Sequence, residues 1–179
     1  IFVLKSTYRI ESISMYTSQS IKVTLIDDDP NMSEMLRDFF QDKYPSSSLT
    51  SFSSGEKALE AMYEAPDLIV LDYHLDSVDP SAMNGMQVLK KIKDRFPDAP
   101  VIFLSGQEKA EVAANTMKYG AYDYVVKNEN AFHRLALITN NILGHYTLKK
   151  NLGTQRFFNV FLVIIVIALL IGIFIIRMR

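Results

Sequence analysis

The chain contains an apolar run that ends directly on a carboxylate. Leu68–Leu71 are four consecutive apolar residues, and Asp72 follows them. Such a run is typical of a strand that is buried on both faces of a parallel sheet. A strand of this kind places the next residue at the carboxyl edge of the sheet, where open α/β folds bind their ligands. We therefore expect a functional site around Asp72.

Three more segments that are expected to be strands end on polar or charged residues. The segments are 21–26, 101–104 and 122–126, and the residues that follow them are Asp27, Asp28 and Asp29, then Ser105 and Gly106, then Lys127. The carboxyl ends of neighbouring parallel strands lie at one edge of a sheet. We therefore expect the carboxylates, the hydroxyl and the ammonium to form one polar cluster with Asp72.

Helical patterns alternate with the predicted strands. The expected helices run from Pro30 to the residue before Pro45, from Ser53 to Tyr63, from Gly85 to Phe96, from Gln107 to Tyr119 and from Asn130 to Tyr146. A short edge strand is expected at 49–52, between the first two helices. Ser53 and Glu56 have the spacing of a capping box, and Gly120 is placed to end a helix in the left-handed conformation. Strand–helix alternation repeated five times predicts an α/β fold, with a parallel sheet covered on both faces by right-handed crossovers.

The composition narrows the class of protein. The chain has 19 basic and 20 acidic residues, so we expect no nucleic acid partner. It has no cysteine, which excludes disulfides and thiolate metal sites. Residues 1–20 are polar and patternless, so we expect a disordered N-terminal extension. The alternative is that translation starts at Met15 and that the preceding residues are an artefact of gene prediction.

The last long segment differs from the others in its hydrophobicity. Phe157–Ile176 contains no charged residue. At about 1.5 Å per residue, a helix of this length would measure roughly 30 Å, the thickness of the hydrocarbon core of a bilayer. An apolar core helix is the alternative, but the expected α/β domain is already complete at Tyr146. We therefore predict a single transmembrane helix.

The expected cluster at the strand ends favours phosphoryl chemistry. Several buried carboxylates repel one another unless a cation lies among them, and oxygen-only ligands with open coordination positions suit Mg²⁺. A carboxylate held against Mg²⁺ can act as a nucleophile towards a phosphoryl group. Lys127 and Ser105 would then offer an ammonium and a hydroxyl to the transferred oxygens.

Five short motifs occur between residues 21 and 146. They are residues 26–30 (IDDDP), Leu71–Asp72, Asn84–Gly85, residues 103–106 (FLSG) and residues 120–127 (GAYDYVVK). In this order they resemble the receiver domain of response regulators in two-component signalling. The resemblance implies a flavodoxin-like, doubly wound fold with five parallel strands in the order 2-1-3-4-5 and helices on both faces.

The resemblance also implies a phosphoacceptor and a metal site. Asp72 would accept a phosphoryl group from the phosphohistidine of a histidine kinase or a phosphotransfer protein. Asp27, Asp28 and Asp72 would hold Mg²⁺, with Asp28 the most direct ligand. The main-chain carbonyl of His74 would complete the set of protein ligands.

The resemblance implies roles for three further residues, and the chain departs from the family pattern at two places. Ser105 and Lys127 would bind the phosphoryl oxygens, and Tyr124 would change rotamer as Ser105 moves inward. The family usually has a cis-proline after its lysine, whereas this chain has Asn128. A cis bond without proline costs about 3–4 kcal/mol, so the aim of Lys127 is in question. The loop Tyr73–Asn84 is also several residues longer than the family pattern.

Together these features predict that the chain is a membrane-tethered phosphoacceptor in a bacterial two-component phosphorelay, and that it is not an enzyme. It would act on an unidentified downstream protein. Its parts would be the N-terminal extension 1–20, the receiver domain 21–147, the linker 148–156 and the span 157–176. Three basic residues precede the span and two follow it, which favours a cytoplasmic receiver; they are Lys149, Lys150 and Arg156, against Arg177 and Arg179. The phosphoryl donors of a receiver are made on that side.

Two alternatives come from other functional classes. A pseudo-receiver would keep the fold and bind a partner without phosphorylation. The complete set of acidic residues with Ser105 and Lys127 argues against it, whereas Asn128 and the long loop support it. A Mg²⁺-dependent phosphohydrolase with an aspartyl nucleophile would need a second acid two residues later, and His74 occupies that position.

Overall fold

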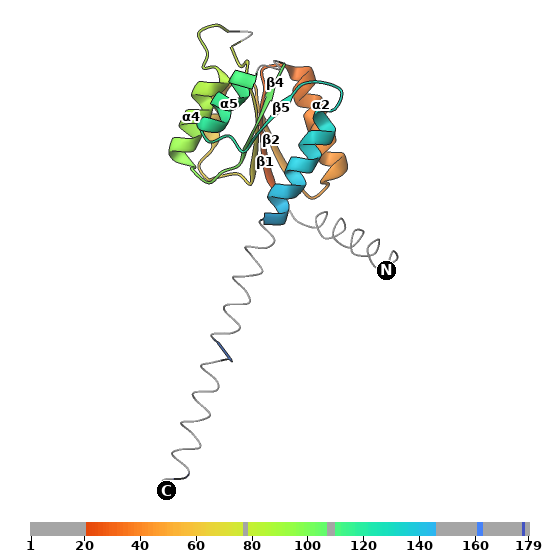
Figure 1. The fold of residues 1–179 in the computed structure, drawn as a ribbon, viewed down its shortest axis with the longest axis vertical. Coiled ribbons are helices and arrows are strands. Elements are labelled where there is room, and N and C mark those ends of the chain that lie inside the picture. Colours follow the sequence, from red (N-terminus) through yellow and green to blue (C-terminus); the bar gives the residue numbers. More distant parts are fainter. Residues whose placement is uncertain (1–20, 77–78, 107–109, 146–160, 163–176, 178–179) are drawn as a thin grey trace. The chain divides into compact units, whose positions relative to one another are not determined.

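The computed structural model describes residues 21–76, 79–106 and 110–145, together with Phe161, Leu162 and Arg177. The chain divides into two compact units, Ile1–Asn140 and Asn141–Arg179. The α/β fold in Figure 1 belongs to the first unit.

Five parallel strands form one sheet in the order β2-β1-β3-β4-β5, which confirms the predicted fold. The strands are β1 (Lys22–Ile26), β2 (Ser48–Phe52), β3 (Leu68–Asp72), β4 (Val101–Ser105) and β5 (Asp123–Val126). Every residue of β3 and β4 is buried, as the unbroken apolar run before Asp72 predicts. The edge strand β2 has no fully buried residue, because only one of its sides pairs with another strand.

Helices cover both faces of this sheet. They are α2 (Pro30–Lys43), α3 (Gly55–Ala61), α4 (Gly85–Arg95) and α5 (Ala110–Lys118), followed by the part of a last helix, over residues 131–140, that belongs to the same unit. Figure 1 shows α4 and α5 on one face and α2 on the other. Phe132, in the part of the last helix that belongs to the first unit, packs against Phe39 of α2 with ring centroids 5.4 Å apart. The doubly wound arrangement is therefore present.

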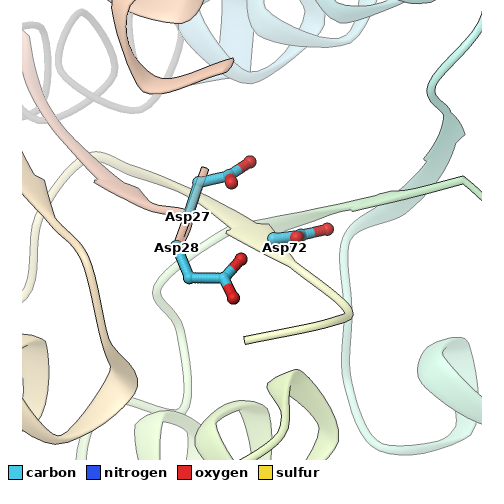
Figure 2. Close-up of side chains that lie close together, drawn as sticks. All are labelled: Asp27, Asp28 and Asp72. Carbon is cyan, nitrogen blue, oxygen red and sulfur yellow. The ribbon is translucent and has the colours of Figure 1, made fainter. Parts of the chain in front are cut away.

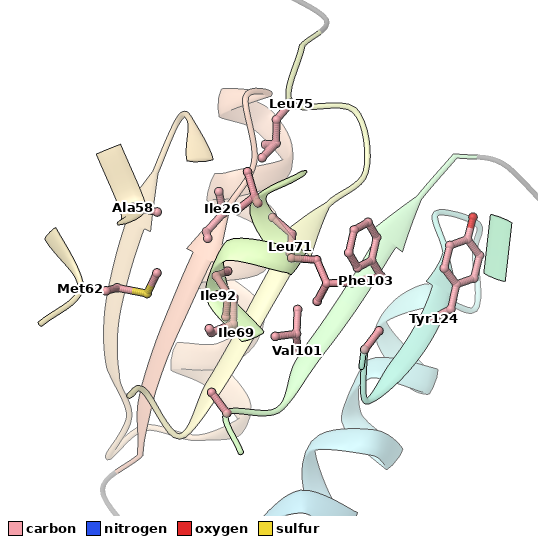
Figure 3. Close-up of a cluster of buried hydrophobic side chains, with 14 residues drawn as sticks. Ile26, Ala58, Met62, Ile69, Leu71, Leu75, Ile92, Val101, Phe103 and Tyr124 are labelled. Atoms are coloured by element: carbon pink, nitrogen blue, oxygen red, sulfur yellow. The ribbon is translucent and has the colours of Figure 1, made fainter. Parts of the chain in front are cut away.

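One cluster of buried side chains lies between the sheet and helices α3 and α4. Figure 3 shows a cluster of 14 buried side chains there, among them Ile69 and Leu71 of β3, Phe103 of β4 and Ile92 of α4. Burial of each large aliphatic side chain contributes about 1.5–3 kcal/mol. This packing fixes the positions of β3 and β4, and therefore of Asp72 and Ser105, which end these strands at the edge of the sheet.

Asp29 and Gly120 have the roles expected at helix ends, whereas Ser53 does not. Asp29 caps α2 through its side chain, which accepts a hydrogen bond from the amide of Asn31 at 2.9 Å. Gly120 has a φ of +90°, as its predicted left-handed role requires. The capping box predicted at Ser53 is wrong, because Ser54 is the N-cap of α3. Glu56 accepts instead from the amide of Met83 in the loop before α4, at 2.6 Å.

The membrane prediction concerns residues that are mostly not described. In the described part of the chain, no helix has the length and apolar character needed to cross a membrane. The predicted span Phe157–Ile176 lies outside the described residues except for Phe161 and Leu162, which are helical and exposed. The predicted extension 1–20 and linker 148–156 lie outside them as well.

Candidate functional site

Three carboxylates meet at the carboxyl ends of two neighbouring strands. Ile26 of β1 pairs with Leu71 of β3, so the next residues, Asp27 and Asp72, lie side by side at the sheet edge. Asp28 follows in the turn into α2, and carboxylate oxygens of all three lie within 4.8 Å of one another (Figure 2). Asp27 is 2% exposed and Asp72 is 5% exposed. The structure thus brings together the acidic residues that the sequence predicts.

Lys127 supplies the positive charge of this cluster. Its Nζ lies 3.0 Å from Asp27 Oδ2 and 3.0 Å from Asp72 Oδ1. No peptide bond in the described residues is cis, so the bond between Lys127 and Asn128 is trans. The departure at Asn128 therefore does not turn Lys127 away from the site.

The buried charges shift the pKa values of their partners. Burial raises the pKa of the Asp27 carboxyl group, and repulsion by Asp72 adds to this shift, whereas Lys127 opposes it. Burial alone would lower the pKa of Lys127, but attraction to Asp72 and Asp27 outweighs it and raises the pKa. Lys127 therefore stays protonated. With all groups ionised, three carboxylates and one ammonium leave two negative charges, which one divalent cation would balance.

Asp28 carries an oxygen that is free for such a cation. Its Oδ2 is buried and has no hydrogen-bond partner in the described structure. By contrast, Asp27 Oδ1 accepts from the amide of Asp29 at 2.9 Å, and Asp72 Oδ1 accepts from the amide of Tyr73 at 2.8 Å. A buried acceptor without a partner costs about 1–3 kcal/mol. Carboxylate oxygens are the ligands that Mg²⁺ prefers, so the residues fit this ion.

The other predicted site residues lie on neighbouring parts of the fold: Ser105 at the end of β4, Tyr124 on β5 and His74 in the loop after β3. Ser105 is fully buried at the end of β4, and its carbonyl accepts from the amide of Lys127 at 2.7 Å. Tyr124, on β5, is 7% exposed and belongs to the buried cluster of Figure 3. The ring of His74 packs edge to face against Tyr73, with centroids 4.8 Å apart. The switch roles of Ser105 and Tyr124, and the ligand role of the His74 carbonyl, stay predictions.

The sequence does not reveal why Gly85 is part of the site. A Cβ atom at this position would lie 2.1 Å from the carbonyl oxygen of Asp72, and the amide of Gly85 donates to the carbonyl of Tyr73 at 3.0 Å. The start of α4 therefore touches the backbone of the central carboxylate. Only the motif Asn84–Gly85 points to this contact, and it gives no geometry.

Comparisons with known proteins agree with this arrangement. The family pattern described as "Response regulator receiver domain" matches residues 23–138. The nitrogen assimilation regulatory protein NtrX of Azorhizobium caulinodans is 32% identical over 128 residues, which are 72% of this chain and 27% of NtrX. The transcriptional regulatory protein CssR of Bacillus subtilis is 32% identical over 108 residues, which are 60% of this chain and 45% of CssR. The chain thus spans less than half the length of these two relatives.

Solved structures show the same fold. The BeF3-activated DrrB receiver domain has a TM-score of 0.60 and 27% identity, and the match covers 70% of this chain and 99% of that one. NtrX from Brucella abortus has a TM-score of 0.64 and 27% identity, and the match covers 77% of this chain and 30% of NtrX. Receiver domains bind Mg²⁺ through acidic residues, and the cluster of Asp27, Asp28 and Asp72 provides them. The chain belongs to the response regulator receiver family.

Proposed function

We propose that Asp72 accepts a phosphoryl group from the phosphohistidine of a histidine kinase or phosphotransfer protein, in a Mg²⁺-dependent reaction. The observation that carries this proposal is the position of the Asp72 carboxylate, which lies 3.0 Å from Lys127 Nζ and beside the unpartnered oxygen of Asp28. A carboxylate beside an ammonium group and beside two further carboxylates that can hold a divalent ion is suited to attack a phosphoryl group.

The residues around Asp72 have separate tasks in this reaction. An oxygen of Asp72 forms a bond to phosphorus as the bond between phosphorus and the histidine nitrogen breaks, and the imidazole leaves. The amide of Tyr73, which donates to Asp72 Oδ1 at 2.8 Å, orients the carboxylate. Lys127 is close enough to bind the incoming phosphoryl oxygens, and its charge favours them. Asp27, Asp28 and Asp72 would hold Mg²⁺, which supplies charge neutralisation between carboxylate and phosphoryl oxygens.

The output follows from a change of shape. Ser105 ends β4 and would bind a phosphoryl oxygen, and Tyr124, on the neighbouring strand, would change rotamer with it. A receiver of this kind shifts a pre-existing equilibrium between two conformations, which a downstream protein reads. In this proposal the chain is a signalling phosphoacceptor and turns over no separate substrate.

The same proposal places the receiver at a membrane. Phe157–Ile176 carries no charge over 20 residues, and Lys149, Lys150 and Arg156 precede it. These residues support a single span with the receiver on the cytoplasmic side. The short linker 148–156 would hold the receiver close to the membrane and to a membrane-bound kinase, which raises the effective concentration of the two partners.

Intact-mass measurement tests the proposed reaction. The full chain in detergent is incubated with Mg²⁺ and acetyl phosphate, and we expect the addition of one phosphoryl group. The Asp72→Asn variant should fold and show no addition. A phosphoryl group retained on that variant would contradict the assignment of Asp72, and a wild-type chain that gains none would favour a phosphorylation-independent binding module.

A further inference from the structure

Main-chain hydrogen bonds hold the backbone at Lys127 and at the next residue. The amide of Lys127 donates to the carbonyl of Ser105 at 2.7 Å, and the amide of Asn128 donates to the carbonyl of Val126 at 2.9 Å. The second bond joins residues two apart, which closes a three-residue turn with Lys127 at its centre. The direction in which the Lys127 side chain leaves the backbone is therefore set by this turn.

Asn128 continues the same turn into the last helix. Its side-chain Oδ1 accepts from the amide of Asn130 at 3.0 Å, and its carbonyl accepts from the amide of Ala131 at 2.9 Å. A side-chain oxygen that binds the amide two residues later forms an Asx turn. Asn128 therefore uses its amide, its carbonyl and its side chain to connect β5 with the helix over residues 131–145.

Packing around Lys127 leaves the side chain room to move. A mostly apolar cavity of about 140 Å³ borders Lys127 and Asn128 and is also lined by Met32, Leu36, Leu104 and Phe132. The lysine side chain has four carbons with freely rotating bonds. Because side chains that border a cavity have fewer packing partners, the ion pairs at the end of the lysine and the turn at its base direct the ammonium group.

We propose that Asn128 is a positioning residue: its side-chain oxygen fixes the Asx turn that directly follows Lys127 and thereby steadies the main-chain turn that aims Lys127 at Asp72. The inference rests on the proposed phosphoryl transfer to Asp72 and adds a determinant of its rate. Asn128 itself is exposed and acts only through Lys127, whose ammonium lies between Asp27 and Asp72.

The test measures phosphorylation rates of the full chain with Mg²⁺ and acetyl phosphate. Asn128→Ala removes the side-chain acceptor, and we expect the rate to fall about 2- to 10-fold, the range that loss of one side-chain hydrogen bond implies. Asn128→Asp keeps an oxygen that can accept from Asn130 and should restore most of the rate. Glu129→Ala changes an exposed neighbour in the same turn and is the matched control, with an unchanged rate expected.

A double-mutant cycle separates positioning from a general structural role. In a Lys127→Met background, Asn128→Ala should have no further effect on the rate, because the group that Asn128 positions is gone. An equal fall in both backgrounds, or an unchanged rate in Asn128→Ala alone, would overturn the inference while Asp72 remains the acceptor. A wild-type chain that gains no phosphoryl group would overturn the proposed function and this inference with it. Thermal unfolding of each variant shows whether the fold is retained.

Discussion

The ammonium of Lys127 lies 3.0 Å from Oδ1 of Asp72, although Asp72 ends β3 and Lys127 follows β5, with β4 between the two strands. The same ammonium reaches Asp27 beyond β3, at 3.0 Å. The Asp27 and Asp72 side chains are almost fully buried, and that of Lys127 is 19% exposed. One lysine therefore pairs with two buried carboxylates, and with Asp28 the ionised cluster keeps two unbalanced negative charges.

Removal of Lys127 should destabilise the fold. In Lys127→Met, Asp27 and Asp72 remain buried without their cation, and breaking a buried ion pair in this way costs about 3–5 kcal/mol. Urea unfolding in the presence of a chelator measures the loss. Saturating Mg²⁺ should recover part of it, because the ion supplies the missing positive charge. A loss below about 1 kcal/mol without metal would show that solvent already screens the cluster.

Removal of Asp28 should have the opposite effect on the metal-free protein. Asp28→Ala deletes a buried oxygen without a described partner and relieves repulsion from Asp27 and Asp72. We expect the unfolding temperature in chelator to stay equal or rise, and Mg²⁺ affinity, measured by calorimetry, to fall at least about tenfold with the lost charged ligand.

Asp29→Ala provides the matched control for Asp28. This change removes the cap of α2 and should cost about 0.5–2 kcal/mol of stability with Mg²⁺ affinity unchanged. Equal Mg²⁺ affinities for the wild type and Asp28→Ala would remove Asp28 from the predicted ligand set.

Gly85 should not tolerate a side chain. In Gly85→Ala the new Cβ would lie 2.1 Å from the Asp72 carbonyl oxygen, so α4 or the backbone of Asp72 must shift. Overpacking of this kind costs about 1–3 kcal/mol, and phosphorylation of Asp72 should slow with it. Gly106→Ala is the stability control, since no described atom lies within 4 Å of a Cβ there. Equal losses of stability in the two variants would contradict the argument.

Glu56 should stabilise the long loop in a pH-dependent manner. The hydrogen bond from the Met83 amide lowers the pKa of Glu56 below its usual 4.5. The stability that this bond contributes is therefore present above pH 4.5 and is lost as the pH falls through the lower folded-state value. Glu56→Gln should lose less than about 1 kcal/mol near neutral pH, because the carboxylate is partly exposed and screened.

Urea unfolding at about pH 7 and about pH 3 tests the role of Glu56. The difference between Glu56→Gln and the wild type should shrink at the lower pH, where both side chains are uncharged. Glu60→Gln, an exposed change later in α3, serves as the control for a general charge effect. A difference that is the same at both pH values would mean that the ionised carboxylate is not what holds the loop.

The proposed membrane span can be tested by fractionation. With Phe157–Ile176 in a bilayer, the full chain should stay in the membrane pellet after an alkaline carbonate wash, whereas a chain that ends at Leu148 should be recovered in the soluble fraction. The absence of charge over the 20 residues is the physical reason. Release of the full chain by the wash would exclude an integral anchor.

The sequence predicted the strand ends because the physical cause is local. An apolar run long enough for a buried strand must end at the sheet edge, so the position of Asp72 follows from Leu68–Leu71 alone. The partners of Asp72 follow from the order of the strands, which the five motifs indicated. Ser105 and Asp27 are then buried because they lie at the ends of β4 and β1, which are inner strands of the sheet.

The remaining features depend on contacts between distant segments. Ser53 and Ser54 are equally good caps in sequence, and the bond between Glu56 and Met83 removes the acid that a capping box at Ser53 would need. The approach of Gly85 to Asp72 depends in the same way on how α4 packs. The hydrogen bonds of Asn128 form the turns next to Lys127, and no periodicity in the sequence encodes these turns.

The hydrogen bond from the Lys127 amide to the Ser105 carbonyl has a mechanical consequence. It joins, through the main chain, the two residues that are proposed to hold the phosphoryl oxygens. If the backbone of Ser105 shifts towards a bound phosphoryl group, this hydrogen bond should shift the backbone of Lys127 in the same direction, and the reverse should hold for a displacement of Lys127. In the proposed function the two groups would therefore move towards the phosphoryl group together, so a substitution that displaces one of them should weaken phosphoryl binding by both.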